Sequence, residues 1–516
     1  MFTRHGFNVR PVEAEGAIAV VQLGRLAGFN ANRRKNYELM SEALVPHRHI
    51  IAPAAATAKA DPAWFGLPLL LSAPYAYQRD ALFAHLEARG VETRPIISGN
   101  FLRQPVCQES REPGSKHYGA CGVDVDPDDY PAADYIHLHG MYIGLHPGTV
   151  MSVGDVTALA DAIASFAFVP KHVTVVTGSN GLVGAALQQY ARAHRPKMSA
   201  TRLDHLEGAL HQFVFVDRTH ADLSDPTAAR KLLFSTRPTR IIHLAAKTAA
   251  TDVMSHQHAE YFMANQAINT NVLQASAALA TSGLLGATDD NTTLLRVVSC
   301  LSSAMLLAGG GVESKVTESD ISVRSQQRRA SIHPVAAGYG SAQLQQLQLS
   351  SWLTKEVPAL SAVALMPSDV FGPAATCAID RPLVNALINN AVVAKRSGTP
   401  MVVLGSGESR QLLFSQDLAK VLVWSMEHYD DAGEPLFVPG VSRSVQKLAE
   451  LAAETVGFTG EIAHDEPSQK VDGPPRRAMS SAKLRTLMPH LKWTALGSAM
   501  AGTLRACNHL AKRRGQ

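Results

Sequence analysis

The chain has 516 residues, of which 46% are hydrophobic and 18% are charged, and its net charge is +4. This length and composition predict a globular protein of two or three domains with large apolar cores. A net charge this small gives no reason to expect a nucleic-acid partner, and no apolar run reaches the roughly 18 residues that a membrane-spanning helix needs.

The cysteines are odd in number and scattered, and they show no metal-ligand spacing. They are Cys107, Cys121, Cys300, Cys377 and Cys507. This usage is typical of a reduced compartment, and the first residues contain no apolar core of a signal peptide. The sequence therefore predicts a cytoplasmic protein with no metal site and no membrane partner.

Residues 1–168 predict a small α+β unit. The spacing of apolar residues predicts helices at 12–44, 77–90 and 155–166. Shorter apolar runs predict strands at 64–71 and 94–97. The polar stretch 109–128 predicts a loop, and Pro170 marks the joint to the next unit.

Residues 173–184 read VTVVTGSNGLVG and predict a buried strand, a tight turn and the start of a helix. Gly178, Gly181 and Gly184 follow the strand at three-residue steps. Small residues let the backbone approach a pyrophosphate, and a helix N-terminus offers free N–H groups and a positive dipole end. The segment therefore predicts a dinucleotide site, with a ligand-free turn as the alternative.

Strands and helices alternate after this motif. Strands are expected at 213–216, 241–246, 294–298 and 360–366, and helices at 226–233 and along the segment that contains Asn265, Asn269 and Asn271. This alternation predicts an α/β fold with a Rossmann-type doubly wound parallel sheet. Ligands of such sheets bind at the carboxyl ends of the strands, where Gly178, Asp217, Ala245 and Ser302 fall.

Several segments of the first unit resemble a known family. They are GFNVRPVEAEGAIAVVQLGRL, RRKNYELM, WFGLPLLL, LEARGVETRPIISGNFLRQPV and ADYIHLHGMYIGLHPG. They are similar to the C-terminal part of the DegT/StrS sugar aminotransferases, in the branch of the CDP-4-keto-6-deoxyglucose 3-dehydrases. The resemblance implies a truncated aminotransferase-like domain over 1–168 that lacks the residues that hold pyridoxal phosphate (PLP), so no PLP is expected.

In that family, four of these positions lie in segments that approach the sugar nucleotide: Arg94, Asn100, Arg103 and His146. The alternative is that the unit is a retained folding or dimerisation module.

The second part of the chain resembles another family along its whole length. The segments are VTGSNGLVG, FVFVDRTHADLSD, PTRIIHLAAK, NTNVLQAS, RVVSCLSS, GYGSA, MPSDVFGP, LGSGESRQLLFSQDLAKVLVW and SSAKLRTLMPHLKWT. In this order they resemble the extended short-chain dehydrogenase/reductases, and among them the GDP-L-fucose synthase family.

This second resemblance implies an NAD(P)-dependent epimerase/dehydratase domain over 171–516. Residues 171–366 would mainly bind the dinucleotide, and 367–516 would form a smaller substrate region. The implied reaction is the NADPH-dependent epimerisation and reduction of GDP-4-keto-6-deoxy-D-mannose by a homodimer.

The same resemblance assigns the site residues. Tyr339 would donate a proton to the substrate carbonyl, Ser302 would bind that carbonyl, and Arg410 would contact the GDP-sugar. The expected cofactor-binding residues are Gly178, Ser179, Asn180, Gly181, Leu182, Gly184, Arg218, Asp222, Ala245, Ala246 and Gln343. Asp417 is expected to cap or pair within its own helix.

The choice between the two dinucleotides rests on neighbouring residues. Arg218 could pair with a 2′-phosphate, which favours NADP, whereas Asp217 could accept a hydrogen bond from a ribose 2′-hydroxyl, which favours NAD. The resemblance implies NADP, with NAD as the alternative.

Three positions depart from the family's acid-base set. Gln343 stands where the family has a lysine that lowers the pKa of the tyrosine, and Ala304 and Ala374 replace a cysteine and a histidine that exchange protons. Substitutes close in sequence are Cys300, His333 and Cys377. Two hypotheses therefore stay open: an oxidoreductase, and a catalytically degenerate NADP/GDP-sugar-binding protein with an assembly or regulatory role.

Overall fold

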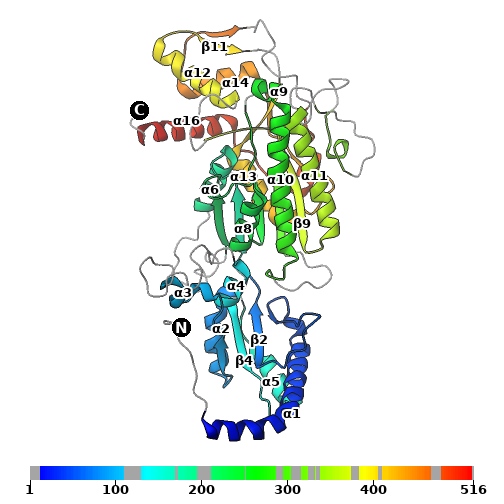
Figure 1. The fold of residues 1–516 in the computed structure, drawn as a ribbon. Coiled ribbons are helices and arrows are strands. Elements are labelled where there is room, and N and C mark those ends of the chain that lie inside the picture. Colours follow the sequence, from blue (N-terminus) through cyan, green and yellow to red (C-terminus); the bar gives the residue numbers. More distant parts are fainter. Residues whose placement is uncertain are drawn as a thin grey trace. The chain divides into compact units, whose positions relative to one another are not determined.

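The structure is a computed structural model, and it describes residues 12–109, 130–168, 172–193, 211–249, 251–285, 295–303, 315–323, 332, 337–373, 383–404, 409–465 and 478–513. The chain forms two compact units (Figure 1). The first comprises Met1–His172 with Leu233–Arg237 and Leu279–Leu294, and the second comprises Val173–Leu232, Pro238–Ala278 and Leu295–Gln516.

The first unit contains a four-stranded sheet with the order β1-β2-β4-β3, in which neighbouring strands are antiparallel. The strands are β1 (Ile51–Pro53), β2 (Gly66–Leu71), β3 (Thr93–Pro95) and β4 (Gly140–Gly144). The helices are α1 (Glu13–Ala43), α2 (Arg79–Glu87), α3 (Pro105–Glu109), α4 (Pro131–His139) and α5 (Val153–Ala164), with short 3-10 turns at Val45–His47, Ala76–Gln78 and Phe101–Arg103.

The first unit confirms the expected helices as α1, α2 and α5 and the expected strands as β2 and β3. α1 is one helix of 31 residues, but it buries only Asn36 and Met40, so its pattern does not mark a continuous buried face. β1, β4 and α4 were not predicted, because short strands owe their pairing to distant β2 rather than to a local pattern. Most of the loop expected at 109–128 lies outside the described residues.

The second unit is organised around a six-stranded sheet with the order β13-β9-β8-β7-β5-β6. The strands are β5 (His172–Thr177), β6 (His211–Val216), β7 (Arg240–His243), β8 (Leu295–Cys300), β9 (Leu360–Pro367) and β13 (Leu436–Val438). The pairs from β5 through β7, β8 and β9 to β13 are parallel. This arrangement confirms the predicted doubly wound parallel sheet.

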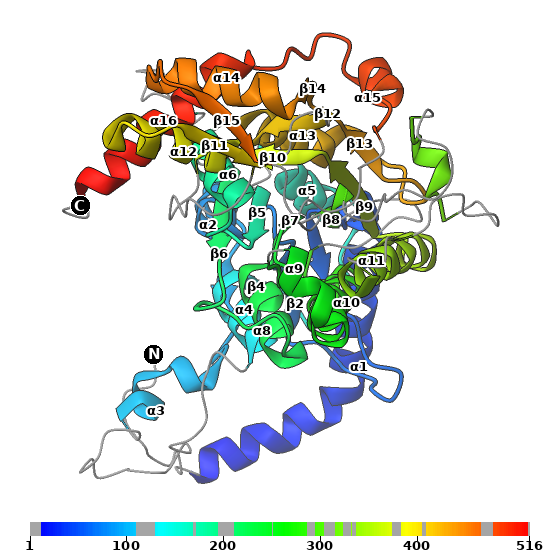
Figure 2. The same cartoon turned by 90° about the horizontal axis from the view of Figure 1, so that it is seen from above.

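Helices cover both faces of this sheet, with α6 and α13 on one face and α8, α10 and α11 on the other (Figure 2). The helices are α6 (Leu182–Ala193), α8 (Pro226–Thr236), α9 (Thr251–His256), α10 (His258–Ala280), α11 (Ala337–Glu356) and α13 (Ser415–His428), with a 3-10 turn at Glu318–Asp320. The apolar face of α13 packs through Leu418 and Leu422 into a core with Val176 of β5 and Leu187 of α6. Both faces of the sheet are therefore buried, as its near-continuous apolar strands require.

Residues after 367 add two small sheets, β10-β12-β14 and β11-β15. Their strands are β10 (Asp369–Phe371), β11 (Met401–Leu404), β12 (Ser409–Phe414), β14 (Val441–Ser444) and β15 (Ile462–Asp465). The accompanying helices are α12 (Leu383–Ser397), α14 (Val445–Val456), α15 (Ala482–Leu487) and α16 (Leu496–Arg513). α14 begins at Ser444, whose Oγ accepts a hydrogen bond from the Lys447 N–H, and ends at Gly457, which has a φ of 69°.

Asp417 in the first turn of α13 holds two distant segments together. Its carboxylate is 1% exposed and accepts hydrogen bonds from Lys420 Nζ (2.8 Å), from the Thr494 N–H (2.7 Å) and from Thr494 Oγ1 (3.0 Å). The expected pairing within the helix is confirmed by Lys420, whereas the contact with Thr494 was not predicted.

Asp417→Ala is expected to destabilise the second unit by about 2–4 kcal/mol, because it leaves two half-buried donors of Thr494 without an acceptor. The midpoint of urea unfolding measures this effect. The control is Glu450→Gln, which removes an exposed pair with Lys447 at the same i,i+3 spacing and is expected to change stability by no more than about 0.5 kcal/mol. Equal midpoints for the two variants would contradict the role given to Asp417.

Candidate functional site

The second unit has a cleft at the carboxyl ends of its central strands. The chain leaves β5, passes to β6 on one side, and returns to β7 on the other side of β5. Such a switch point separates the loops that follow adjacent strands and leaves a crevice between them. The cleft has a volume of about 820 Å³. It is lined by the glycine loop (178–184, except Ser179), by the loop after β6 (216–224, except His220), by the residues after β7 (244–248) and by Tyr339.

The three glycines of the first loop differ in what an added side chain would contact. Gly178 has a φ of +68°, and a Cβ there would lie 2.8 Å from the Ala245 nitrogen. A Cβ on Gly184 would lie 2.5 Å from the Ser179 carbonyl oxygen, so this glycine allows α6 to approach the loop. A Cβ on Gly181 would meet only the Gly178 oxygen, at 3.3 Å, and Gly181 lines the cleft. At Gly181 the missing side chain therefore leaves room for a ligand to approach the backbone, and is not required by contacts within the protein.

Gly181→Ala and Gly184→Ala are therefore expected to separate binding from folding. Gly184→Ala should lower the free energy of unfolding by about 1–3 kcal/mol, because the clash is with backbone atoms that cannot rotate away. Gly181→Ala should leave the unfolding midpoint almost unchanged and weaken dinucleotide binding by about tenfold, or about 1.4 kcal/mol. Thermal melting and a fluorescence titration measure the two effects, and a Gly181→Ala protein that binds as the parent does would show that no ligand approaches there.

The backbone amides of the glycine loop are only partly available. The Ser179 N–H donates to Val216 O and the Gly181 N–H donates to Gly178 O. Leu182 begins α6 and lines the cleft, and the N–H groups of a first helical turn have no acceptor within their helix. An anion at this loop would therefore be held by the start of α6 rather than by every amide from Ser179 to Leu182.

The loop after β6 brings three charged residues to the cleft: Asp217, Arg218 and Asp222. Asp217 accepts hydrogen bonds from the Thr219 N–H, Thr219 Oγ1, His220 Nδ1 and Asn180 Nδ2. The hydrogen bonds from Thr219 and His220 hold the pKa of this carboxyl well below its usual range. Arg218 is 86% exposed and forms an ion pair with Asp222 at 3.2 Å.

Tyr339 and Ser302 come together at the other part of the cleft. Tyr339 lies in the first turn of α11 and Ser302 follows the end of β8, and both residues line the cleft. Burial raises the pKa of Tyr339, and the neighbouring Cys300 raises it further, whereas the Ser302 side chain lowers it. Burial raises the pKa of the Cys300 thiol to about 12, so this thiol stays neutral and is a poor substitute acid-base group.

Gln343 lies one helical turn after Tyr339 in α11, on the same face of the helix. Its side chain is 2% exposed, and its Oε1 is buried without a hydrogen-bond partner among the described residues. An unmade hydrogen bond of a buried group costs free energy, but Gln343 does not line the cleft, so its Oε1 is not placed to bind a ribose there. The open first turn of α6 fits a pyrophosphate, so the glycine loop suits a dinucleotide.

Most of the predicted site residues line one cleft. These are Gly178, Asn180, Gly181, Leu182, Gly184, Arg218, Asp222, Ala245, Ala246, Ser302 and Tyr339. Ser179, Gln343 and Arg410 do not line it: Ser179 is held by Val216 and Gln188, Gln343 is buried behind Tyr339 along α11, and Arg410 lies on β12 opposite Arg443. Ala304, His333, Ala374 and Cys377 lie outside the described residues.

The structure adds cleft residues that the sequence prediction missed. Lys247 and Thr248 follow β7, and Ser368 follows β9. Lys247 forms an ion pair with Glu260 and its Nζ lies 5.6 Å from the centre of the Tyr261 ring. Its position directly after Ala245 and Ala246, at the carboxyl end of a predicted strand, was the signal that could have identified it.

The candidate sugar-nucleotide residues of the first unit have protein partners. Asn100 and Arg103 both bond to Asp134, and Arg94 pairs with Glu92 at 2.7 Å. The Gly148 N–H donates to His146 Nδ1 at 3.1 Å. These contacts give Asn100 and Arg103 a structural role in the unit, whereas Arg94 and His146 are exposed.

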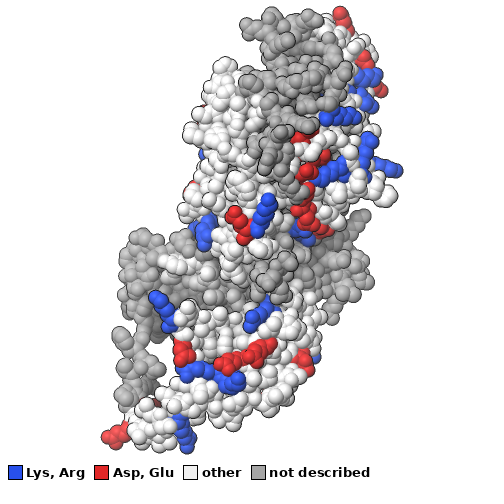
Figure 3. All heavy atoms as spheres, turned by 90° about the vertical axis from the view of Figure 1, so that its right-hand side faces the viewer, with Lys and Arg blue, Asp and Glu red and all other residues white. Residues whose placement is uncertain are grey.

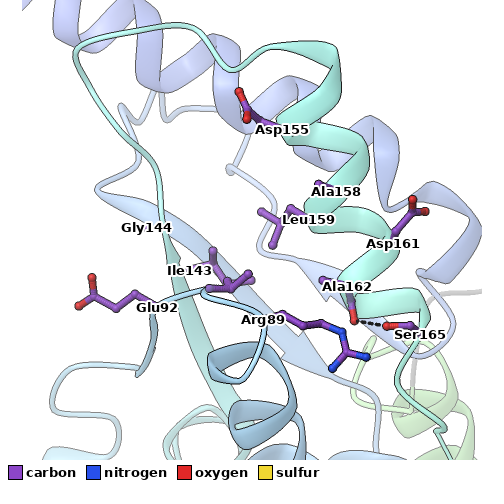
Figure 4. Close-up of a pocket in the computed structure, with 11 residues that line it drawn as sticks. Arg89, Glu92, Ile143, Gly144, Asp155, Ala158, Leu159, Asp161, Ala162 and Ser165 are labelled. Atoms are coloured by element: carbon purple, nitrogen blue, oxygen red, sulfur yellow. Dashed lines mark hydrogen bonds between the residues drawn. The ribbon is translucent and has the colours of Figure 1, made fainter.

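A second hollow, of about 680 Å³, lies in the first unit between β4 and α5 (Figure 4). Asp155 of this hollow belongs to a capping box with Ser152, and Glu92 pairs with Arg94. Arg89 bonds to the side chain of His85. Charges of opposite sign that already have partners give this hollow no defined ligand, so the cleft of the second unit remains the candidate site.

The surface and the cysteines add three observations. On the face drawn in Figure 3, positive and negative side chains alternate without a large patch of one sign. Within the part of the chain that the structure describes, no helix has the length and apolarity to cross a membrane. Cys107 is disulfide-bonded, which contradicts the expectation that the scattered cysteines are all reduced.

The fold and the cleft define a class: a doubly wound α/β domain with a cleft where the strand order reverses. The model of the NAD dependent epimerase/dehydratase family matches residues 174–438, and the chain belongs to this family. A GDP-L-fucose synthase of Dictyostelium discoideum is 24% identical over 334 residues, which cover 64% of this chain and 93% of the relative. A GDP-L-fucose synthetase of Naegleria fowleri bound to NADP shares the fold with a TM-score of 0.54 and 23% identity, over 66% of this chain and 95% of that one.

The first part of the chain is similar to a different family. The model of the DegT/DnrJ/EryC1/StrS aminotransferase family matches residues 1–119. A GDP-4-keto-6-deoxy-D-mannose 3-dehydratase of Yersinia pseudotuberculosis is 33% identical over 145 residues, which cover 28% of this chain. The chain spans about a third of the length of that relative (33%), so the activity of the whole relative is not transferred to this chain.

Proposed function

We propose that the second unit is an oxidoreductase that uses a nicotinamide dinucleotide to epimerise and reduce GDP-4-keto-6-deoxy-D-mannose. The observation that carries this proposal is that Tyr339 and Ser302 line the same cleft as the glycine loop. The match to nearly the full length of a GDP-L-fucose synthase supports the substrate. The GDP-L-fucose synthetase of Naegleria fowleri binds NADP, which supports NADP here.

The reducing step needs a proton donor at the substrate oxygen. A reduced nicotinamide, when bound, supplies the hydride that the carbonyl carbon accepts. The Tyr339 phenol donates its proton to the carbonyl oxygen, so the C=O bond becomes an alcohol, and the phenolate regains a proton from solvent. The Ser302 hydroxyl, held beside the phenol, orients the carbonyl oxygen toward Tyr339.

The raised pKa of Tyr339 opposes this proton transfer, because it reflects an unstable phenolate. The phenol stays protonated and can donate at neutral pH, but the phenolate that it leaves is destabilised by burial. Gln343 carries no charge that would stabilise the phenolate. The proposed reaction is therefore slower than that of an enzyme with a cation at this position.

The remaining assignments accompany this proposal. We place the domain boundary between residues 168 and 171, and we propose a homodimer in the cytoplasm. We propose no PLP chemistry in the first unit. Arg410 remains a proposed contact to the GDP-sugar.

A second candidate function is binding without turnover, which the uncharged Gln343 favours. The full chain is mixed with GDP-4-keto-6-deoxy-D-mannose and NADPH or NADH, the absorbance of the reduced nicotinamide is followed, and the sugar product is identified by chromatography. We expect oxidation of the dinucleotide together with GDP-fucose. Tight binding of the dinucleotide with no oxidation would reject the oxidoreductase and support the second candidate.

A further inference from the structure

The first observation concerns where Asp217 lies. It directly follows Val216, the last residue of β6, and its carboxylate accepts a hydrogen bond from Asn180 of the glycine loop after β5. Both residues line the cleft. In doubly wound sheets an acidic residue in this place, after the second strand of the unit, meets the ribose of the adenosine half of a dinucleotide.

The second observation concerns how firmly Asp217 is held. Its Oδ1 accepts from the Thr219 N–H at 2.9 Å, from Thr219 Oγ1 at 2.6 Å and from His220 Nδ1 at 2.7 Å. Its side chain is only 17% exposed, and these bonds keep its pKa low, so it is charged throughout the neutral range. Oδ2 accepts from Asn180, and because a carboxylate oxygen has two lone pairs it can accept one hydroxyl more.

The third observation concerns Arg218, the cation that could receive a 2′-phosphate. Its side chain is 86% exposed and its guanidinium pairs with Asp222, a weak exposed ion pair. Arg218 can leave Asp222 for a phosphate, but that phosphate would lie beside the fixed charge of Asp217. Repulsion between close charges in a partly buried site outweighs the gain from one exposed and mobile cation.

We propose that Asp217 is the residue that selects the dinucleotide, and that the cleft takes NAD(H) in preference to NADP(H). The inference rests on the proposed function, and it departs from the NADP that the relatives support. The ribose 2′-hydroxyl donates to Asp217 Oδ2, while a 2′-phosphate at the same place carries negative charge and no donor at neutral pH. Asn180 takes part by orienting the carboxylate from the glycine loop.

The test compares NADH and NADPH on the full chain by titration of nicotinamide fluorescence, which requires no turnover. We expect NADH to bind at least about tenfold more tightly than NADPH. Asp217→Asn keeps an acceptor oxygen and removes the charge, so the preference should fall to about threefold or less, mainly through tighter NADPH binding. The control is Asp225→Asn, which changes the carboxylate that bonds to the Thr227 N–H at the start of α8 and does not line the cleft, and which should preserve the preference.

The comparison within the unaltered protein decides the question even where Asp217→Asn fails to fold. Tighter binding of NADPH than of NADH, lost selectively in Arg218→Ala, would assign the site to a 2′-phosphate and overturn this inference while leaving the proposed oxidoreductase intact. Equal affinities for the two dinucleotides would also overturn it. Absence of binding for both would instead overturn the proposed function and this inference together.

Discussion

Tyr339→Phe is expected to lower the turnover of the keto sugar by about a hundredfold to ten-thousandfold, the usual contribution of a positioned general acid. The variant removes only the phenolic oxygen. The ring keeps its contacts with Met254 and Tyr261, so the fold should persist. Affinity for the dinucleotide should change far less than turnover, because the phenol acts on the substrate oxygen. Turnover is measured by oxidation of the reduced dinucleotide under saturating substrate.

The control for this variant is Tyr261→Phe. Tyr261 belongs to the same small apolar cluster but does not line the cleft. It should retain turnover within about threefold, because no proton transfer is assigned to its hydroxyl. If Tyr339→Phe and Tyr261→Phe were equally active, the proton donor would have to be another group.

Gln343→Lys is expected to raise turnover at neutral pH by about tenfold or more. An ammonium one turn from Tyr339 would stabilise the phenolate and lower the pKa that burial now raises, which makes proton donation easier. The buried acceptor Oε1 of Gln343 disappears at the same time, so part of the cost of burying the charge is offset. Gln343→Met, which is similar in length and uncharged, is the control and should give no gain.

The pH dependence of turnover should show whether Gln343→Lys acts by lowering the pKa of Tyr339. The folded-state pKa of Tyr339 lies above the ordinary value of about 10, so the unaltered protein loses its proton donor only when the pH rises beyond that value. Gln343→Lys should move this alkaline limb to lower pH. A gain in turnover without movement of the limb would show that the lysine acts on substrate binding rather than on Tyr339.

The sequence by itself placed the glycine loop, the central strands and most of the residues of the cleft. β-branched runs such as 173–177 are buried on both sides, and this local signal survives without knowledge of the partners. The short strands β1 and β4 carry no such signal, because they depend on pairing with β2. The same limit applies to Tyr339 of α11 and Ser302 after β8, which the tertiary structure brings into one cleft.

What the sequence determined, then, is which residue types follow each strand, since a strand–glycine–helix pattern is a property of neighbouring residues. The tertiary structure decided which of them are free to bind a ligand. In the folded chain the Ser179 N–H donates to Val216 O and is not available to a ligand, and Arg410 does not line the cleft. Asp217 is held by hydrogen bonds from Asn180 and Thr219. The bonds from Ser179 to Val216 and from Asn180 to Asp217 join two different loops, so no pattern of neighbouring residues contains them.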